Sequence, residues 1–235
     1  MNTSEIRQLW ETPVYVDTLA FSDEFNEQLK ALAIAAEREA SDTGSFYDRT
    51  VYYNLFAKDD PVLKQFEDVM SARFRDFLYR GIKDGRAYEW DVEVRAFANI
   101  YGYGQRIRPH YHHGCDFVSV YYADVGDGSK PDFRTNEEGR FVVIDPRGAC
   151  QYPVHAKSTR LPADKGTLMI HPAYLWHESE TFFAGGQRVM ISCEYTILHD
   201  QRKVFTRLAK AENPNPPPIP FKADSRQTLY TTHYK

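Results

Sequence analysis

Residues 166–177 read Gly-Thr-Leu-Met-Ile-His-Pro-Ala-Tyr-Leu-Trp-His, and residues 187–198 read Gln-Arg-Val-Met-Ile-Ser-Cys-Glu-Tyr-Thr-Ile-Leu. In the first stretch a short apolar run ends at a proline turn, and His177 follows this turn. In the second stretch a Gly-Gly pair precedes a longer apolar run that Arg188 opens. Short apolar runs bounded by turn residues predict two buried strands.

Similar runs lie upstream of these two strands, from about residue 89 onward. Turns that contain glycine and proline separate them. Short strands at this spacing predict a sandwich or a barrel rather than alternating strands and helices. The five further predicted strands are Asp91–Tyr101, Arg106–Tyr111, Phe117–Asp124, Gly139–Ile144 and Lys157–Leu161.

The first third of the chain is predicted to be helical. Ser22 is a suitable N-cap for a helix whose apolar face continues to about Ala40. Asp60, followed by proline, opens a second amphipathic helix that runs to about Arg80. Because each helix has one apolar stripe, each should pack on a sheet. A short edge strand is predicted at residues 12–17, ahead of the first helix.

The length of 235 residues fits one domain or a tight pair. We expect a single domain over residues 1–211, with a helical part at about 1–88 and a strand-rich core at about 89–200. The proline-rich segment 212–235 should form an extended arm.

The composition is that of an ordinary globular protein and disfavours several functions. The net charge is −4 and no basic stripe is present, which argues against a nucleic acid partner. No apolar run approaches about 18 residues, so a membrane partner is not expected. The N-terminus is too polar for a signal peptide, which makes a cytoplasmic location the default. The three cysteines are too few for a disulfide framework, and the sequence is compatible with a homodimer.

Six of the eight histidines lie between residues 110 and 177. Residues two apart in a strand point to the same side, so His110 and His112 would present both imidazoles to one metal ion. His113 would then face the opposite side. A single His-x-His pair occurs often by chance, and His171 is expected to be a packed or rim histidine. The histidines expected in loops or in the tail are His155, His199 and His233.

Arg188 would point into a sheet that otherwise contains Val, Met, Ile and Cys. A buried arginine requires an acidic partner. This partner is either an Asp or Glu of the protein or the carboxylate of a ligand that the guanidinium holds bidentately. A His-x-His pair, a distant His177 and an arginine on the next strand are together more specific than any one of them.

This order of residues resembles the iron(II)/2-oxoglutarate-dependent oxygenases, which carry His-x-Asp, a distal His and then an Arg or Lys. Asn99-x-Tyr101-x-x-Gly104 is similar to the nucleic-acid demethylating and prolyl-hydroxylase branches of that superfamily. A bacterial and phage family of 2-oxoglutarate oxygenases with a His-x-His motif is more similar still, over about residues 9–198. The motifs that carry this resemblance are Pro109-His-Tyr-His-His-Gly114, Val118-Ser-Val-Tyr-Tyr-Ala-Asp124, Asp145-Pro-Arg147, Pro172-Ala-Tyr-Leu-Trp-His177 and Arg188-Val-Met-Ile-Ser192, the last with its Ser two positions later than in the family.

The resemblance implies a mainly β fold with flanking helices: a double-stranded β-helix (jelly-roll, cupin-like) packed against the N-terminal helices. It implies that His110, His112 and His177 hold Fe(II), and that 2-oxoglutarate chelates the metal while Arg188 binds its far carboxylate. Dioxygen is the other cosubstrate. A C–H bond of a small molecule or peptide would be oxidised, most simply by hydroxylation, with release of succinate and CO2. The residues that would assist Arg188 are Asn99, Tyr101 and Ser192.

One departure from the superfamily pattern concerns the acidic ligand, whose place is taken by His112. The usual set of two histidines and one carboxylate becomes three histidines, which leaves Fe(II) more positive. Two other assignments stay open at this point. Asp116 could supply the carboxylate from beyond the turn at His113-Gly114, or His113 could replace His112.

Two further functions also stay open. One is a 2-oxoglutarate-independent three-His dioxygenase of the cupin type, in which Arg188 would bind the carboxylate of the substrate. The other is a non-enzymatic jelly-roll binding module whose histidines hold no functional metal. Formation of succinate would distinguish the 2-oxoglutarate oxygenase from the three-His dioxygenase. The metal content of protein prepared without chelators would distinguish the oxygenase from the binding module.

Overall fold

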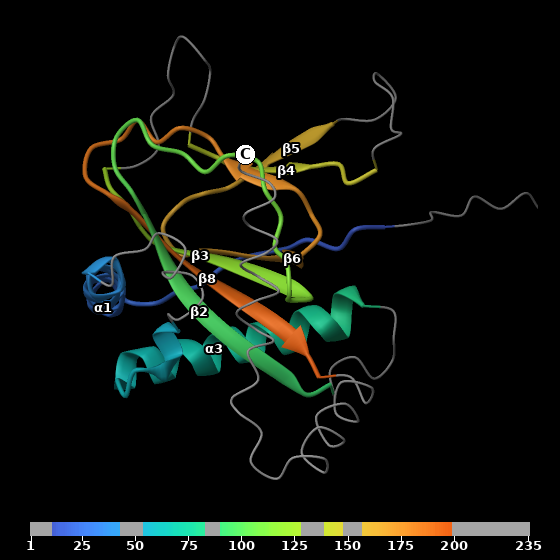
Figure 1. Ribbon diagram of the computed structural model, residues 1–235, viewed down its shortest axis with the longest axis horizontal. Helices are drawn as coiled ribbons and strands as arrows, with labels where there is room; N and C mark the ends of the chain where they lie inside the picture. Colours follow the sequence, from blue (N-terminus) through green and yellow to red (C-terminus); the bar gives the residue numbers. More distant parts are fainter. Residues whose placement is uncertain (1–10, 43–53, 83–89, 128–138, 148–156, 199–235) are drawn as a thin grey trace, which may run out of the picture.

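The computed structural model describes residues 11–42, 54–82, 90–127, 139–147 and 157–198, which form two facing antiparallel sheets with helices on one side (Figure 1). This arrangement confirms the mainly β fold with flanking helices. The elements in chain order are β1 (Tyr15–Thr18), α1 (Asp23–Asp42), the 3-10 turn η1 (Leu55–Ala57), α3 (Pro61–Gly81), β2 (Val92–Tyr101), β3 (Phe117–Val125), β4 (Phe141–Ile144), β5 (Ser158–Leu161), β6 (Thr167–Pro172), β7 (His177–Ser179) and β8 (Arg188–Ile197).

The larger sheet has five strands in the order β1-β6-β3-β8-β2, and the smaller sheet has three in the order β5-β4-β7. All neighbouring strands are antiparallel. β8 lies between β2 and β3 and pairs with β2 along its whole length, from Val92↔Ile197 to Tyr101↔Arg188. Neighbours that are distant in sequence occur in both sheets, as in a jelly roll, so the predicted double-stranded β-helix is confirmed.

Helices α1 and α3 cover the face of the larger sheet that points away from β4 and β5 (Figure 1). The Ser22 hydroxyl accepts the N–H of Phe25 at 3.1 Å and so caps α1, and Asp60 caps α3 in the same way. Phe74 of α3 stacks on Tyr195 of β8 with ring centroids 3.9 Å apart. The apolar faces of both helices therefore pack on the sheet, as the sequence predicts.

Side chains along β8 alternate between two environments. One set packs in the apolar core under the helices: Val189, Ile191, Cys193 and Tyr195. The other set points toward the smaller sheet: Arg188, Met190, Ser192 and Glu194. The polar members of the second set place charged and hydrogen-bonding groups in the space between the two sheets.

The predicted strand Arg106–Tyr111 is wrong, because this segment forms no continuous ladder with a neighbour. It meets β7 at a single bridge, where His110 and His177 exchange backbone hydrogen bonds of 2.9 Å. Beyond the bridge the ladder is interrupted, since Pro109 has no N–H and the N–H of Ile107 donates to a serine hydroxyl of β7. The other predicted strands and both helices are confirmed, with ends that differ by a few residues.

Some predictions fall on residues that the structure does not describe. These are the predictions for His155, His199 and His233 and for the proline-rich arm at 212–235. Among the described helices, none combines the length and the apolar character that a membrane crossing requires.

Candidate metal centre

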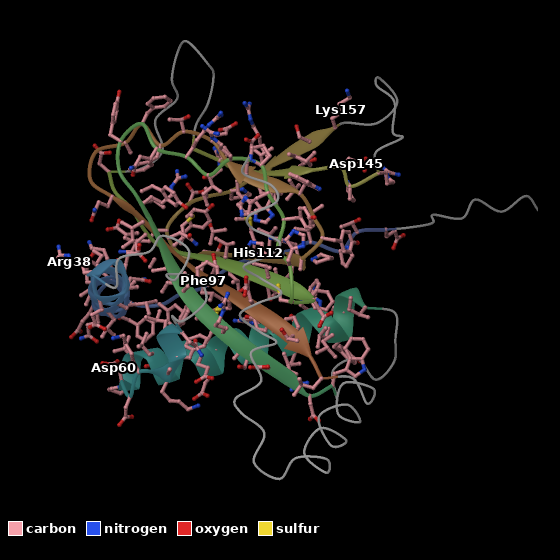
Figure 2. The ribbon with its side chains drawn as sticks, in the orientation of Figure 1. Arg38, Asp60, Phe97, His112, Asp145 and Lys157 are labelled. Atoms are coloured by element: carbon pink, nitrogen blue, oxygen red, sulfur yellow. The ribbon has the colours of Figure 1, made fainter. Side chains whose placement is uncertain are left out.

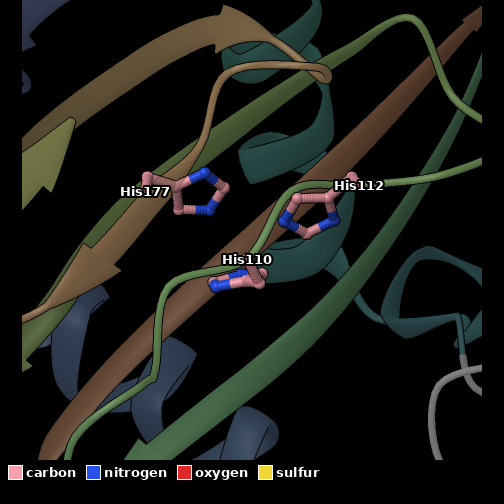
Figure 3. Close-up of side chains that lie close together, drawn as sticks. All are labelled: His110, His112 and His177. Atoms are coloured by element: carbon pink, nitrogen blue, oxygen red, sulfur yellow. The ribbon is translucent and has the colours of Figure 1, made fainter. Parts of the chain in front are cut away.

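Three histidines from two segments meet between the sheets (Figure 3). His110 and His112 come from the segment that precedes β3, and His177 begins β7. Each offers one ring nitrogen, and the three nitrogens lie within 4.8 Å of one another. Figure 2 places His112 in the middle of the molecule, whereas Arg38 lies at its outer edge. The structure therefore brings together the three histidines that the sequence selects as metal ligands.

Backbone hydrogen bonds fix these side chains relative to one another. His110 and His177 each donate their N–H to the carbonyl oxygen of the other at 2.9 Å, so the two residues lie directly opposite each other. The N–H of His112 donates to the carbonyl oxygen of Ala173 at 3.0 Å, in the turn ahead of β7. The ring centroids of His110 and His177 are 4.2 Å apart, and that of His112 is 5.3 Å from each. Main-chain contacts thus hold the three imidazoles in one cluster.

The second ring nitrogen of each histidine is already hydrogen-bonded. Nδ1 of His110 and Nδ1 of His177 each lie 2.9 Å from a backbone carbonyl oxygen two residues earlier in the chain. A carbonyl oxygen only accepts, so Nδ1 carries the proton in both rings and Nε2 keeps its lone pair. Nδ1 of His112 lies 3.0 Å from a carboxylate oxygen of Glu194, with the same result. All three Nε2 atoms are therefore available to a metal ion.

Burial keeps two of these imidazoles neutral. The pKa of His110 is lowered to about 4, first because the ring is desolvated and then because His112 lies close to it. Desolvation likewise lowers the pKa of His177 well below its usual range. Neutral imidazole is the form that binds a metal ion. Neither ring needs to lose a proton before metal binds at neutral pH.

A cavity of about 100 Å³ lies beside the three histidines, between the two sheets. Asn99 and Tyr101 of β2 and Ser192 of β8 line its wall on the larger sheet. The Asn99 amide donates to the Ser192 hydroxyl at 3.0 Å. Burial raises the pKa of Tyr101 well above its usual range, so the phenol stays neutral and can donate a hydrogen bond. The three predicted assisting residues and the histidines therefore line the same cavity.

Arg188 is almost completely buried, with 1% of its surface exposed, and lies directly opposite Tyr101. Within the described residues, its Nε and Nη2 atoms have no hydrogen-bond partner. No acidic side chain in that part of the chain bonds to these atoms, so an internal Asp or Glu partner finds no support there. Burial lowers the pKa of Arg188, but a guanidinium keeps its charge in proteins. A buried cation with two unused donors is a site for an anion.

Two aromatic rings and a glycine surround the guanidinium of Arg188. Its central carbon lies 4.8 Å from the ring centroid of Phe182 and 5.8 Å from that of Tyr122. The Tyr122 hydroxyl is also buried and has no hydrogen-bond partner among the residues that the structure describes. Gly139 approaches from another side with φ of 67°, and a Cβ there would lie 2.3 Å from Nη2 of Arg188. Only glycine fits at this position without displacing the guanidinium.

Asp116 and His113, the two residues considered as other ligands, do not join the cluster, and neither does His171. Asp116 accepts the N–H of Ile197 through Oδ2 at 2.7 Å, at the far end of β8. His113 packs on the ring of Tyr111 with centroids 4.1 Å apart. His171 is completely buried, with its ring centroid 4.6 Å from that of His177, and its Nε2 has no partner among the described residues.

Sequence reasoning missed Glu194, whose carboxylate contacts His112. Glu194 lies two residues after Ser192 on β8 and therefore points to the same side of the sheet. That spacing is the signal by which it could have been found.

Residues 95–194 match the model of the family described as "Putative 2OG-Fe(II) oxygenase". The matched region contains the three histidines, Arg188 and Glu194. The resemblance of the sequence to the iron(II)/2-oxoglutarate-dependent oxygenases is thereby confirmed. A match to an oxygenase family also supports an oxidoreductase over a non-enzymatic binding module. No curated protein sequence matches this chain.

Two solved structures are similar in fold, and a third matches a smaller part of this chain. HygX from Streptomyces hygroscopicus, with nickel and 2-oxoglutarate bound, has 12% identity and a TM-score of 0.51, over 79% of this chain and 82% of that one. AviO1 from Streptomyces viridochromogenes Tue57 has 15% identity and a TM-score of 0.51, over 79% of this chain and 90% of its own. A 2OG-Fe(II) oxygenase family oxidoreductase from Burkholderia pseudomallei has 16% identity and a TM-score of 0.41, over 59% of this chain. The chain spans 57% of the length of that last protein.

Proposed function

We propose that this chain, whose residues 95–194 match the 2OG-Fe(II) oxygenase family, is a non-haem Fe(II)- and 2-oxoglutarate-dependent dioxygenase. It would oxidise, most simply hydroxylate, a C–H bond of a small molecule or peptide, with release of succinate and CO2. The observation that carries the proposal is the buried Arg188, whose Nε and Nη2 atoms have no hydrogen-bond partner among the described residues, together with the three-histidine cluster. A histidine cluster alone fits many reactions, whereas the added anion site fits a cosubstrate with a free carboxylate.

The donor set of the cluster fits a divalent iron ion. Imidazole nitrogens suit Fe, and three protein ligands leave coordination positions for a bidentate cosubstrate and for oxygen. HygX, which has the same fold, was solved with nickel and 2-oxoglutarate bound, and this supports the pairing of a metal with that cosubstrate. When bound, Fe(II) would supply dioxygen activation coupled to the decarboxylation of 2-oxoglutarate.

The polar wall of the cavity would orient the cosubstrate. Arg188 would form charge-assisted hydrogen bonds with the carboxylate of 2-oxoglutarate that is distant from the metal. Tyr101 lies opposite Arg188 and would donate a hydrogen bond from its phenol to the same molecule. Asn99 and Ser192, already hydrogen-bonded to each other, would support its middle part. These groups are fixed in the sheet before any ligand arrives, which reduces the entropic cost of orientation.

Apolar side chains would limit access of water to the reacting groups. Phe141 of the smaller sheet stacks against His177 with ring centroids 5.1 Å apart and covers one face of that imidazole. Val120 and Met190 line the cavity from the larger sheet. A dry wall of this kind protects a reactive oxygen species from side reactions.

Two aromatic residues would contact the substrate outside the cavity. Tyr111 lies between His110 and His112 in the chain, and Trp176 directly precedes His177. Their rings pack with centroids 4.9 Å apart, and 42% of the surface of Trp176 is exposed. This pair is therefore an apolar surface next to the metal ligands, and it suits an organic molecule or a peptide side chain.

A second candidate function is favoured by the third imidazole in place of a carboxylate. Three-His sites of cupin-type dioxygenases bind the substrate directly to the metal and do not use 2-oxoglutarate. Arg188 would then hold the carboxylate of the substrate. The two functions differ in one measurable product, because only the first converts 2-oxoglutarate to succinate.

Turnover of 2-oxoglutarate tests the proposed function. Protein loaded with Fe(II) in air, with ascorbate and 2-oxoglutarate, should form succinate slowly even without its primary substrate. The same protein loaded with Zn(II), which has no redox chemistry, should form none. Absence of succinate from Fe(II)-loaded protein, while oxygen is consumed in the presence of carboxylated thiols or diketones, would favour the second candidate.

A further inference from the structure

The three histidines of the cluster differ in what their Nδ1–H groups contact. Those of His110 and His177 donate to neutral backbone carbonyl oxygens at 2.9 Å. That of His112 donates to a carboxylate oxygen of Glu194 at 3.0 Å. His112 is also the residue that stands where the superfamily has its acidic ligand. A carboxylate is therefore present next to this position, but it contacts the far nitrogen of the His112 ring instead of facing the metal directly.

The fold holds Glu194 firmly in this orientation. Its side chain is 5% exposed and lies on the face of β8 that points between the sheets. Arg95 stands directly opposite on β2, and its Nη2 donates to Oε2 of Glu194 at 2.6 Å. The other carboxylate oxygen, Oε1, is the one that contacts His112. Arg95 thus fixes one oxygen of the carboxylate while the other accepts from the imidazole.

We propose that Glu194 is a positioning residue that supplies, through His112, the negative charge that the missing carboxylate ligand would have given to the metal. A carboxylate on the Nδ1–H of a ligating histidine fixes its tautomer and ring orientation and makes its Nε2 a stronger donor. The charge also offsets part of the positive charge that three neutral ligands leave on the ion. This proposal rests on the metal site of the proposed function.

The charge of Glu194 can be removed without removing its hydrogen bond. In Glu194→Gln the side chain keeps its shape, and the amide oxygen still accepts from the Nδ1–H of His112. Mutation of such an outer partner typically weakens metal binding by about 10–100-fold, and we expect removal of the charge to account for a loss in this range. Titration of the anaerobic protein with Co(II) alone, followed by its visible absorption, should show this loss. The Fe(III)/Fe(II) potential of the same variant should rise, because a negative charge near the metal has been removed.

Glu180→Gln is the matched control. Glu180 is also 5% exposed and is paired with an arginine, Arg160, at 2.5 Å. It contacts none of the three histidines through any described hydrogen bond. Its replacement removes a buried carboxylate from an ion pair and should leave Co(II) affinity unchanged. An equal loss in both variants would mean that the effect is general destabilisation, and the proposal would be wrong.

Repeating Glu194→Gln in a His112→Asp background separates a direct effect on the metal from an effect on folding. An Asp side chain places a carboxylate in the ligand position and has no Nδ1–H to donate to Glu194. In this background Glu194→Gln should cost no Co(II) affinity, because the route through the imidazole is gone. A structural role for Glu194 would instead give the same fold-loss in both backgrounds and would overturn the proposal.

The outcome for wild-type protein separates this proposal from the proposed function. Wild-type protein that binds no Co(II) or Fe(II) would contradict both. Wild-type protein that binds metal as tightly as Glu194→Gln, at the same potential, would contradict the role of Glu194 alone.

Discussion

Replacing His177 by alanine is expected to abolish metal binding and turnover. His177 is 2% exposed, and its position is fixed by the paired backbone hydrogen bonds with His110. Two histidines alone make a poor Fe(II) site. The loss should therefore exceed the roughly 10–100-fold that removal of a hydrogen-bond partner of a ligand costs. Anaerobic equilibrium dialysis with Fe(II), with metal measured by elemental analysis, gives the affinity directly.

His113→Ala is the control for this experiment. His113 comes directly after His112 in the chain. Its ring packs on Tyr111, and it is not part of the cluster. This variant should keep the full metal content. Loss of metal in His113→Ala with retention in His177→Ala would show that the assignment of the ligands is wrong.

Replacing Arg188 by methionine is expected to raise the apparent KM for 2-oxoglutarate strongly. Hydrogen bonds to charged groups contribute about 1.5–3 kcal/mol each. Loss of a bidentate contact should therefore raise KM by roughly 10–100-fold or more. Metal affinity should be unchanged, because Arg188 contacts none of the three histidines in the described structure. Succinate formation at increasing 2-oxoglutarate concentrations measures the effect.

The melting temperature of Arg188→Met shows whether a higher KM reflects weaker binding of 2-oxoglutarate or a misfolded protein. Arg188 is buried, and two of its nitrogens have no hydrogen-bond partner among the described residues, so an apolar side chain of similar length should leave the Tm of the ligand-free protein unchanged or higher. Added 2-oxoglutarate should raise the Tm of metal-loaded wild type but not that of Arg188→Met. Arg73→Met, on the outer surface of α3, is the control and should behave as wild type. An unaltered dependence on 2-oxoglutarate in Arg188→Met would remove the case for this cosubstrate.

Much of the fold could be predicted because local signals and burial agree. The cap at Asp60 with its following proline, and the apolar faces of both helices, mark elements that the structure contains. The runs that became β3, β6 and β8 are apolar and bounded by turn residues. These strands lie in the centre of the larger sheet, where both faces are covered and polar residues are disfavoured.

The parts that could not be predicted depend on contacts between distant residues. β7 has only three residues, and it becomes a strand because β4 pairs with it. The segment around His110 reads as a strand, but its partner supplies one bridge rather than a ladder. The histidines still converge, because that single bridge and the contact of His112 with Ala173 replace the strand geometry that the spacing suggests.

The carboxylate beside His112 also depends on a contact between residues that are distant in sequence. Glu194 lies 82 residues farther along the chain, and only the pairing of β8 with its neighbours brings it to the histidine. Its partner Arg95 is 99 residues away from it and looks from the sequence like a solvated basic residue. That Nε and Nη2 of Arg188 have no partner within the described part of the chain is likewise a property of packing, although the burial of Arg188 was foreseeable from the apolar strand that it opens.

The most direct test of the central claim is an anaerobic titration of the protein with Fe(II) and then with 2-oxoglutarate, followed by visible absorption. Neither the protein with Fe(II) alone nor the protein with 2-oxoglutarate alone should absorb in the visible. The account predicts that the complete mixture develops a metal-to-ligand charge-transfer band that saturates at one 2-oxoglutarate per Fe(II). Bound Fe(II) that gives no such band at saturating 2-oxoglutarate would contradict the account, because the keto acid would then not chelate the metal held by His110, His112 and His177.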